Sequence, residues 1–404
     1  MDVNHAPKKL LNAGSHRVCS VEETLARILP MRHEFGITRI ANVTGLDRVG
    51  VPVAIAIRPN ARSVAVSQGK GATYLHAKAS ALMEAIEIWH AERFNGPVYY
   101  ASFADLSQQH AFINLARLPQ TPGPEMARTT RMHWVAAHDL MSDAQKLVPL
   151  EMVHADYTHP LSQECGFYPT STNGLASGNH PIEAICHAIC EVIERDALAV
   201  WHHRPLEARR QTRLDPASFS DAAHIATAAK FAAAGLECAL WDVSTDIGVA
   251  TVVCVVHEPG VPDAHLGLGS GTHPDPSTAL HRAMNEAAQT RLNYISGARE
   301  DLFHAEFSVQ GREEKTAAFA DLLTPDAPMR SVATLSGQIN KSLEEDLAWL
   351  KSRLHQAGVE EIAVVDLSRA DFGIPVVRVI IPGLEAPHDD AAYIMGPRAK
   401  RGMA

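Results

Sequence analysis

Three stretches of the sequence repeat one pattern, in which a glycine-rich run leads into a helix with regularly spaced polar side chains. The clearest is NGLASGNHPIEAICHAICEVIERD, residues 173–196, in which Asn179 and His180 fall near the expected N-cap and Pro181 in the first turn. Its polar positions recur at i, i+4, i+8 and i+11, on one stripe of a helix: Glu183, His187, Glu191 and Glu194. The flanking positions are apolar, so much of this helix should be buried. Buried carboxylates stay ionised only opposite cations or donors, which predicts a metal ion or a cation-bearing ligand.

The same pattern occurs once earlier and once later in the chain. Residues 80–87 read SALMEAIE and residues 282–289 read RAMNEAAQ, and both match HAICEVIE at 187–194. Each helix follows a glycine-rich run, which suggests one site assembled from all three. The alternative is three amphipathic helices with solvated acidic faces, but the apolar flanks leave little room for a solvated face.

A second repeat indicates the fold class. A helical stretch, a strand, an Asp-containing turn and a second apolar strand follow one another in three regions: residues 20–59, 222–256 and 342–382. A glycine ends each helix, and another precedes each second strand. Repetition on this scale predicts a pseudosymmetric α/β (α+β) fold of helix–strand–turn–strand units, with the three polar helices packed on the sheets.

The remaining segments are expected to be peripheral. We expect an N-terminal tail at 1–16, a domain at 17–398 with a peripheral insertion at about 97–165, and a C-terminal tail at 399–404. A strand is expected near 132–137 within the insertion. We expect the cations at the C-terminus to be solvated: Arg398, Lys400 and Arg401.

Composition excludes several classes of protein. The formal charge of −10 over 404 residues argues against a nucleic-acid-binding protein, which would carry a basic face. The six cysteines are scattered without a CxxC pair and are expected to be free thiols in a reducing compartment. The N-terminus has no apolar signal region and no stretch approaches the length of a membrane span, so we expect a cytoplasmic protein without membrane contact.

The polar residues of the three helices and their glycine runs favour a magnesium–nucleotide site. The candidate metal ligands are all glutamates: Glu84, Glu87, Glu183, Glu191, Glu194 and Glu286. The candidate anion contacts are all cations: Arg17, Lys70, Arg195, Arg282 and Arg291. Hard carboxylates suit Mg²⁺ rather than zinc, and His187 is expected to be structural. No P-loop motif is present, but a glycine-led helix N-terminus still favours phosphate.

Four motifs resemble the YcaO superfamily: GKGATYLHAKASALMEAIE, NGLASGNHPIEAICHAICEVIERDA, RAMNEAAQTR and GIPVVRVIIPGLE. The resemblance extends from about Arg17 to Arg398. It implies an ATP-dependent enzyme that phosphorylates the oxygen of a peptide backbone amide, after which a nucleophile replaces the phosphate. A Cys, Ser or Thr side chain then gives an azoline, and external sulfide gives a thioamide.

The resemblance also implies roles for individual residues. Nucleotide and Mg²⁺ are expected at the matching positions of three helices: Ser80, Glu84 and Glu87; Asn179, Glu183, Glu191, Glu194 and Arg195; Arg282, Glu286 and Gln289. Arg17 and Thr24 match a further nucleotide-binding pair more loosely, and Lys70 is a further expected contact. The acids would hold Mg²⁺ while the arginines stabilise phosphate charge, so we expect Glu191, Arg195 and Arg282 to be catalytic.

Two features separate this chain from azoline-forming members. It ends in GPRAKRGMA instead of a PxPxP tail, and we expect no fused E1-like or leader-recognition domain. The stretches GITRIANVTGLDRVGVPV and PGLE…GPRA resemble members that act with a TfuA partner in thioamide formation, which is our first expectation, with a separate sulfur donor and a possible homodimer. The alternatives are an azoline-forming cyclodehydratase and a non-catalytic nucleotide-binding accessory protein for methylthiolation of a ribosomal protein.

Overall fold

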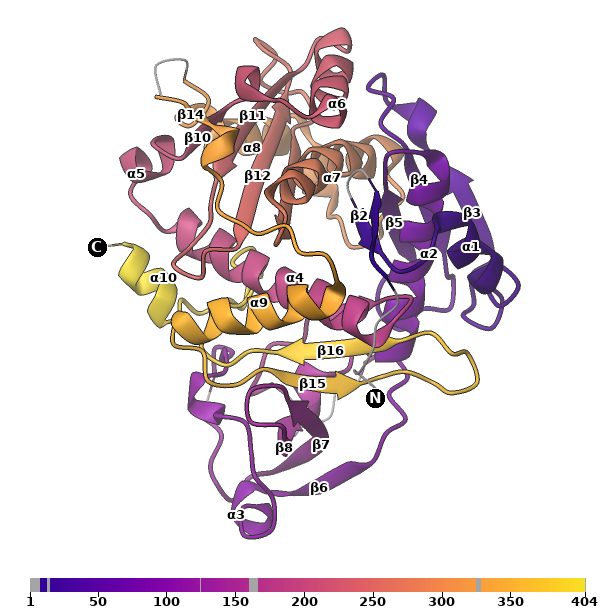
Figure 1. The fold of residues 1–404 in the computed structure, drawn as a ribbon, viewed down its shortest axis with the longest axis vertical. Coiled ribbons are helices and arrows are strands. Elements are labelled where there is room, and N and C mark those ends of the chain that lie inside the picture. Colours follow the sequence, from indigo (N-terminus) through magenta and orange to yellow (C-terminus); the bar gives the residue numbers. More distant parts are fainter. Residues whose placement is uncertain (1–7, 13–14, 124, 160–165, 325–327, 404) are drawn as a thin grey trace.

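The computed structural model describes residues 8–12, 15–123, 125–159, 166–324 and 328–403. Three sheets, each packed against one long helix, make up most of the molecule (Figure 1). Each sheet contains one of the three predicted repeats, so the predicted pseudosymmetric α/β fold is confirmed.

The first unit begins with a helix that has the predicted capping box, in which Ser20 and Glu23 bond to each other's backbone N–H groups. Three antiparallel strands and the first long helix follow: α1 (Val21–Ile28), β3 (Arg39–Asn42), β4 (Val53–Ile57), β5 (Val66–Lys70) and α2 (Tyr74–Ala91).

The second unit repeats this order: α6 (Ala222–Ala233), β11 (Glu237–Asp242), β12 (Ala250–His257), β13 (Gly267–His273) and α7 (Pro276–Ser296). Its sheet has the order β13-β12-β11-β10-β14 and is extended by β10 (Arg213–Asp215) and β14 (Arg330–Ser331). Two further helices lie in the connections: α5 (Leu206–Arg210) and α8 (Val309–Ala320).

The third unit is assembled from two distant parts of the chain. The C-terminal part supplies α9 (Leu343–Gln356), β15 (Ala363–Asp366) and β16 (Val376–Ile380). The third strand and the long helix come earlier in the sequence: β9 (Leu175–Ser177) and α4 (Pro181–His202). β16 pairs antiparallel with β9, through Val377 and Ala176 among others.

Glycines at equivalent places in the three units have positive φ angles, which fit glycine best. They end the first helix of each unit or precede its second strand: Gly36, Gly235 and Gly358, and Gly50, Gly248 and Gly373. Other glycines allow helix and strand to touch. A Cβ at Gly69 would lie 2.1 Å from the Ala81 nitrogen of α2, and one at Gly269 would lie 2.3 Å from the Ala283 oxygen of α7. The strand backbones therefore lie directly against the helices, which fixes the position of the polar stripes.

The described residues of the segment 97–165 include strands of the core sheet, so the segment is not a peripheral insertion. It contributes β6 (Val98–Ser102), α3 (Phe103–Leu106), β7 (Arg131–Asp139) and β8 (Ala144–Pro149). β7, which includes the predicted strand, pairs with β6 and β8 and also with β15 of the third unit. Trp134 of β7 is fully buried. The strand joins the six-stranded sheet because its apolar side chains pack into the same core.

Both ends of the described chain are attached more firmly than we expected. Residues 1–7 of the expected tail lie outside the described residues, but β1 (Leu10–Asn12) and β2 (Ser15–Arg17) form a hairpin. The buried Lys9 pairs with Asp346 of α9 at 2.6 Å. At the other end, α10 (Pro397–Gly402) buries Arg398, so the expectation that this residue is solvated is wrong. Lys400 and Arg401 are exposed, as expected.

Two further expectations concern the cysteines and membrane contact. The cysteines among the described residues are free thiols, as expected, and Cys165 lies outside those residues. No described helix has both the length and the apolar character required to cross a bilayer.

Candidate active site

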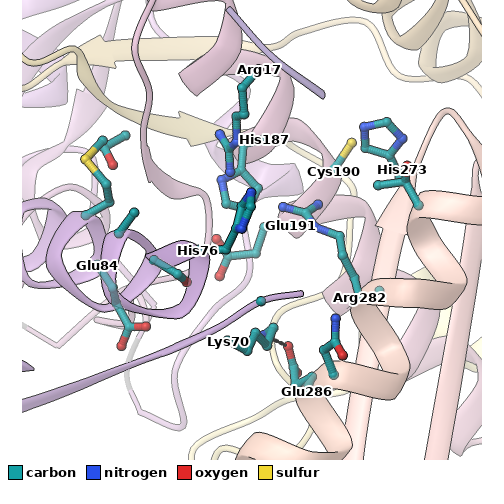
Figure 2. Close-up of a pocket in the computed structure, with 18 of the residues that line it drawn as sticks. Arg17, Lys70, His76, Glu84, His187, Cys190, Glu191, His273, Arg282 and Glu286 are labelled. Carbon is teal, nitrogen blue, oxygen red and sulfur yellow. Dashed lines mark hydrogen bonds and ion pairs between the residues drawn. The ribbon is translucent and has the colours of Figure 1, made fainter. Parts of the chain in front are cut away.

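One cavity of about 610 Å³ lies between α2, α4 and α7 and is closed on another side by the N-terminal hairpin and α1. Apart from Arg291, the residues that we assigned to the site from the sequence all line it: Arg17, Thr24, Lys70, Ser80, Glu84, Glu87, Asn179, Glu183, Glu191, Glu194, Arg195, Arg282, Glu286 and Gln289. In Figure 2, Arg17, Glu191 and Arg282 point toward one central space although they come from distant parts of the chain. The structure therefore brings the three polar stripes together.

Three carboxylates of the cavity wall have pKa values far above their usual range because burial penalises their charge. Burial raises the pKa of Glu84 to about 7, that of Glu191 to about 7 and that of Glu87 to about 8. Glu87 Oε1 accepts hydrogen bonds from the backbone nitrogen and the hydroxyl of Ser177, at 2.8 and 2.6 Å. These donors oppose the shift without cancelling it. A cation in the cavity would favour the ionised form of all three carboxylates.

Glu194 and Glu286 meet at a shared serine. The Ser270 hydroxyl donates to Glu194 at 2.8 Å, and the Ser270 backbone nitrogen donates to Glu286 at 3.4 Å. Glu286 also forms an ion pair with Lys70. Burial would raise the pKa of Glu286, but Lys70 and Arg195 outweigh it and hold the value below the usual range. Burial and the charge of Glu286 raise the pKa of Glu194.

Two arginines give the cavity a positive side. Arg282 donates to the carbonyl of Thr272 at 3.2 Å, and within the described chain it has no carboxylate within 4 Å. Burial, and then the charge of Arg17, lower its pKa. Arg195 lies 4.0 Å from Glu191, and the surrounding glutamates raise its pKa despite burial. A half-buried guanidinium without a carboxylate partner is suited to an anionic ligand.

Glu183 connects the N-terminal segment to α4. Its carboxylate accepts from Arg17 Nη1 at 2.9 Å, from the Val18 nitrogen at 3.0 Å and from the Asn179 nitrogen at 3.1 Å. Both of its oxygens are thus engaged by protein donors, and its predicted role as a metal ligand stays a prediction. The Thr24 hydroxyl donates to Asn179 Oδ1 at 3.1 Å, so the loosely matched Arg17–Thr24 pair contacts the start of α4.

The cavity has the donor and acceptor groups that a nucleotide with Mg²⁺ requires. Among the described residues, no three His, Cys, Asp or Glu side chains could hold a metal ion by themselves. This arrangement suits Mg²⁺, which is usually bound by one or two carboxylates together with phosphate and water oxygens. Both polar atoms of the buried Gln68 side chain, and Gln289 Oε1, have no hydrogen-bond partner within the described residues. Gln68 and Gln289 both line the cavity, so these unpaired groups lie in its wall.

The structure places in the candidate site some residues that we did not predict, and it excludes one that we did. Ser177 and Ser270 hold the glutamates. Both lie in the glycine-rich runs that precede α4 and α7, a position that could have identified them. Gln68 immediately precedes the first of the glycines in GKG. Arg291 does not line the cavity, because its guanidinium is paired with the buried Asp47 at 3.0 Å. His187 does line it, and burial lowers its pKa well below the usual range, so its imidazole is neutral.

The sequence of this chain matches a family model and several known proteins. A family model described as YcaO cyclodehydratase, ATP- and Mg²⁺-binding, matches residues 68–385. A protein of Rhizobium leguminosarum bv. trifolii, named for its position in the tfuA 3′ region, is 34% identical over 95% of this chain and 92% of its own length. A Methanothermobacter thermautotrophicus protein is 37% identical over 90% of this chain and 93% of its own.

Two solved structures share the fold. YcaO from Methanopyrus kandleri, bound with AMPPCP and Mg²⁺, has a TM-score of 0.77 and 23% identity, over 97% of this chain and 99% of that one. A heterocyclase in complex with substrate and cofactor has a TM-score of 0.80 and 23% identity. That match covers 98% of this chain but 56% of the heterocyclase chain, so this chain spans little more than half of that protein.

Proposed function

Because the chain belongs to the YcaO family, we propose that it binds ATP and Mg²⁺ in the cavity between α2, α4 and α7 and activates a backbone amide of a peptide or protein substrate. The observation that carries this proposal is the pairing of opposite charges in one cavity. Carboxylates with raised pKa values line one part, and Arg282, a cation without a carboxylate partner in the described chain, lines another. A magnesium–triphosphate supplies the charge that each part lacks.

The glutamates would hold Mg²⁺ together with phosphate and water oxygens, with one or two carboxylates to each ion. Glu84, Glu87 and Glu191 are the strongest candidates, because their raised pKa values mean that the folded protein gains most by bringing a cation to them. Glu194 and Glu286 would complete the metal site, with Ser270 fixing their separation and Lys70 neutralising part of their charge.

The arginines and amides would bind and orient the phosphates. Bound together, ATP and Mg²⁺ would supply a phosphoryl group for the amide oxygen of the substrate. Arg282 and Arg195 would stabilise the negative charge that develops during this transfer, as catalytic residues. Arg17, Lys70 and Thr24, with Ser80, Asn179 and Gln289, are assigned to nucleotide binding. Glu183 would act by fixing Arg17 and Asn179.

For the overall reaction we propose thioamide formation with a TfuA-like partner. The relative in the tfuA 3′ region, which matches 95% of this chain, supports this assignment. In this reaction the amide oxygen takes the terminal phosphoryl group of ATP and ADP leaves. Sulfide then adds to the amide carbon, and phosphate leaves with the original oxygen. The sulfur would come from a separate donor. The second candidate is an azoline-forming cyclodehydratase, which the description of the matching family model favours.

Mass spectrometry can test both candidates while the substrate is still unidentified. The purified chain, a TfuA-like protein, sulfide, ATP and Mg²⁺ are incubated with an extract of cells that lack the gene, and the peptides are then compared. Thioamidation adds the mass difference between sulfur and oxygen, whereas cyclisation removes one water. The Glu191→Ala variant serves as the control. A peptide that gains the sulfur mass only with the intact site supports thioamidation. Peptide-independent ATP turnover with no modified product would contradict both candidates.

A further inference from the structure

The end of α4 is held by residues from the C-terminal segment. Asp196, which directly follows Arg195, is completely buried. Arg398 Nε donates to Asp196 Oδ1 at 2.8 Å and to Oδ2 at 3.0 Å. The backbone nitrogen of Glu385 also donates to Oδ1, at 3.0 Å. Every donor found for Asp196 among the described residues therefore comes from the C-terminal segment.

Glu385 determines where α10 begins. Its Oε2 accepts from the Tyr393 hydroxyl and the Gly396 nitrogen, each at 2.8 Å. Its Oε1 accepts from the backbone nitrogens of Arg398 and Ala399, each at 2.9 Å. A carboxylate at a helix N-terminus satisfies N–H groups that have no partner within the helix. We call Asp196, Glu385 and Arg398 the C-terminal clasp.

The clasp lies outside the cavity but next to residues that line it. None of its three members lines the cavity, whereas Arg195 and Glu194, the two residues that precede Asp196, both do. α10 packs against α4 (Figure 1). The clasp also closes the segment 386–395, which places the charge of Asp389 near enough to contribute to the raised pKa of Arg195. The C-terminal segment thus acts on Arg195 both through α4 and through this loop.

We propose that Arg398 is a positioning residue for the active site, which holds the last turns of α4 through Asp196 so that Arg195 and Glu194 face the cavity. Removal of one partner from a buried ion pair leaves an uncompensated charge, which the structure relieves by admitting water or shifting backbone. In this case the backbone that shifts carries Arg195. The identity of the ligand in the cavity rests on the proposed function. The effect of Arg398 on the position of α4 is independent of that function.

The test measures nucleotide affinity and local opening separately. Isothermal titration with AMPPCP and Mg²⁺ should show affinity about tenfold lower, or worse, in Arg398→Met than in the parent chain. Arg398→Lys, which keeps the charge, should recover part of the loss. Asp196→Asn combined with Arg398→Met should recover more than either single change predicts, because no uncompensated buried charge then remains. Asp246, the second acid that pairs with Arg398, is largely exposed and can be solvated. Arg401→Ala, on the same helix but exposed, is the matched control and should bind normally.

Hydrogen exchange distinguishes the failure of this proposal from the failure of the proposed function. In Arg398→Met, the amides of 191–197 should exchange faster than in the parent, while those of α7 keep their rates. Unchanged exchange in 191–197 would overturn the positioning role whatever the nucleotide does. Equal loss of affinity in Arg398→Met, Arg398→Lys and the double variant would also overturn the positioning role. The positioning role predicts losses that depend on the charges left at positions 196 and 398, whereas general unfolding would lower affinity equally in all three. A parent chain that does not bind AMPPCP refutes the proposed function alone, and exchange still decides the role of Arg398.

Discussion

Replacement of Glu87 by glutamine should stabilise the ligand-free protein at neutral pH. Both hydrogen bonds that Glu87 accepts from Ser177 end on one oxygen, Oε1, so a glutamine carbonyl can keep both of them. The substitution then removes only the ability of this carboxyl group to ionise, which the unfolded chain uses at pH 7 and the folded protein does not. Burial therefore keeps Glu87 mostly protonated in the ligand-free folded protein at this pH.

The size of the effect follows from the pKa of Glu87, which burial raises from 4.5 to about 8. Between these two values the folded protein binds a proton that the unfolded chain has lost. The stabilisation that this proton gives is fully present below the unfolded pKa and is lost as the pH rises toward 8. Each pH unit above the unfolded pKa is worth about 1.36 kcal/mol. At pH 7, ionisation of Glu87 therefore stabilises the unfolded parent chain by ~3 kcal/mol, and a glutamine at this position lacks that stabilisation. At pH 5 the same reasoning gives ~0.7 kcal/mol.

Urea unfolding with EDTA at pH 5, 6 and 7 measures this difference. Glu87→Gln should exceed the parent in free energy of unfolding by ~3 kcal/mol at pH 7 and by less than ~1 kcal/mol at pH 5. AMPPCP with Mg²⁺ should then stabilise the parent more than the variant. The control is Glu92→Gln, because the buried Glu92 is paired with Arg58 and Arg93. That change should cost ~3–5 kcal/mol. The reasoning would be refuted if Glu87→Gln were no more stable than the parent at pH 7. It would also be refuted if the variant exceeded the parent by the same free energy of unfolding at pH 5 and at pH 7.

The remaining predictions concern turnover, affinity and packing. Glu191→Ala should abolish ATP turnover with an unchanged far-UV circular dichroism spectrum, and retained turnover would remove this residue from the metal site. Arg282→Ala should weaken AMPPCP–Mg²⁺ binding about tenfold or more in isothermal titration while the Tm changes little, because Arg282 has no described carboxylate partner; a large fall in Tm with normal affinity would reverse that assignment. Gly269→Ala should lower the free energy of unfolding by ~3 kcal/mol, because its Cβ would meet a helix carbonyl at 2.3 Å, whereas Gly45→Ala, with nothing within 4 Å, should unfold like the parent.

The sequence was sufficient to predict the parts of the fold that local patterns encode. Glycines at fixed places within each unit marked the ends of helices and the turns, and they have the same positive φ in all three units. The spacing of Glu84, Glu191 and Glu286 after glycine-rich runs indicated one shared site, because glycines within or next to a strand let a helix backbone lie against it. Helix periodicity then determined which side chains faced the cavity.

The sequence was not sufficient to predict contacts between distant residues. Lys9 and Asp346 are 337 positions apart, and Arg398 and Asp196 are 202 apart. Each cation looks like a solvated terminal residue until the fold supplies a buried acid. Arg291 was predicted to contact an anion in the site, but the fold pairs it instead with Asp47 of another unit. The strand β7 looked peripheral because nothing in its own sequence reveals that β15 lies beside it.

The order of strands in the six-stranded sheet has a consequence for how this protein is made. β15 and β16, near the C-terminus, sit between β7 and β9, which leave the ribosome roughly two hundred positions earlier in the chain. Until the final hairpin arrives, the two earlier strands have edges that no native neighbour covers, and such edges invite pairing with other chains. The third unit therefore completes its folding only after β15 and β16 have been translated, and a chaperone that shields β7 and β9 during that interval should raise the yield of folded protein.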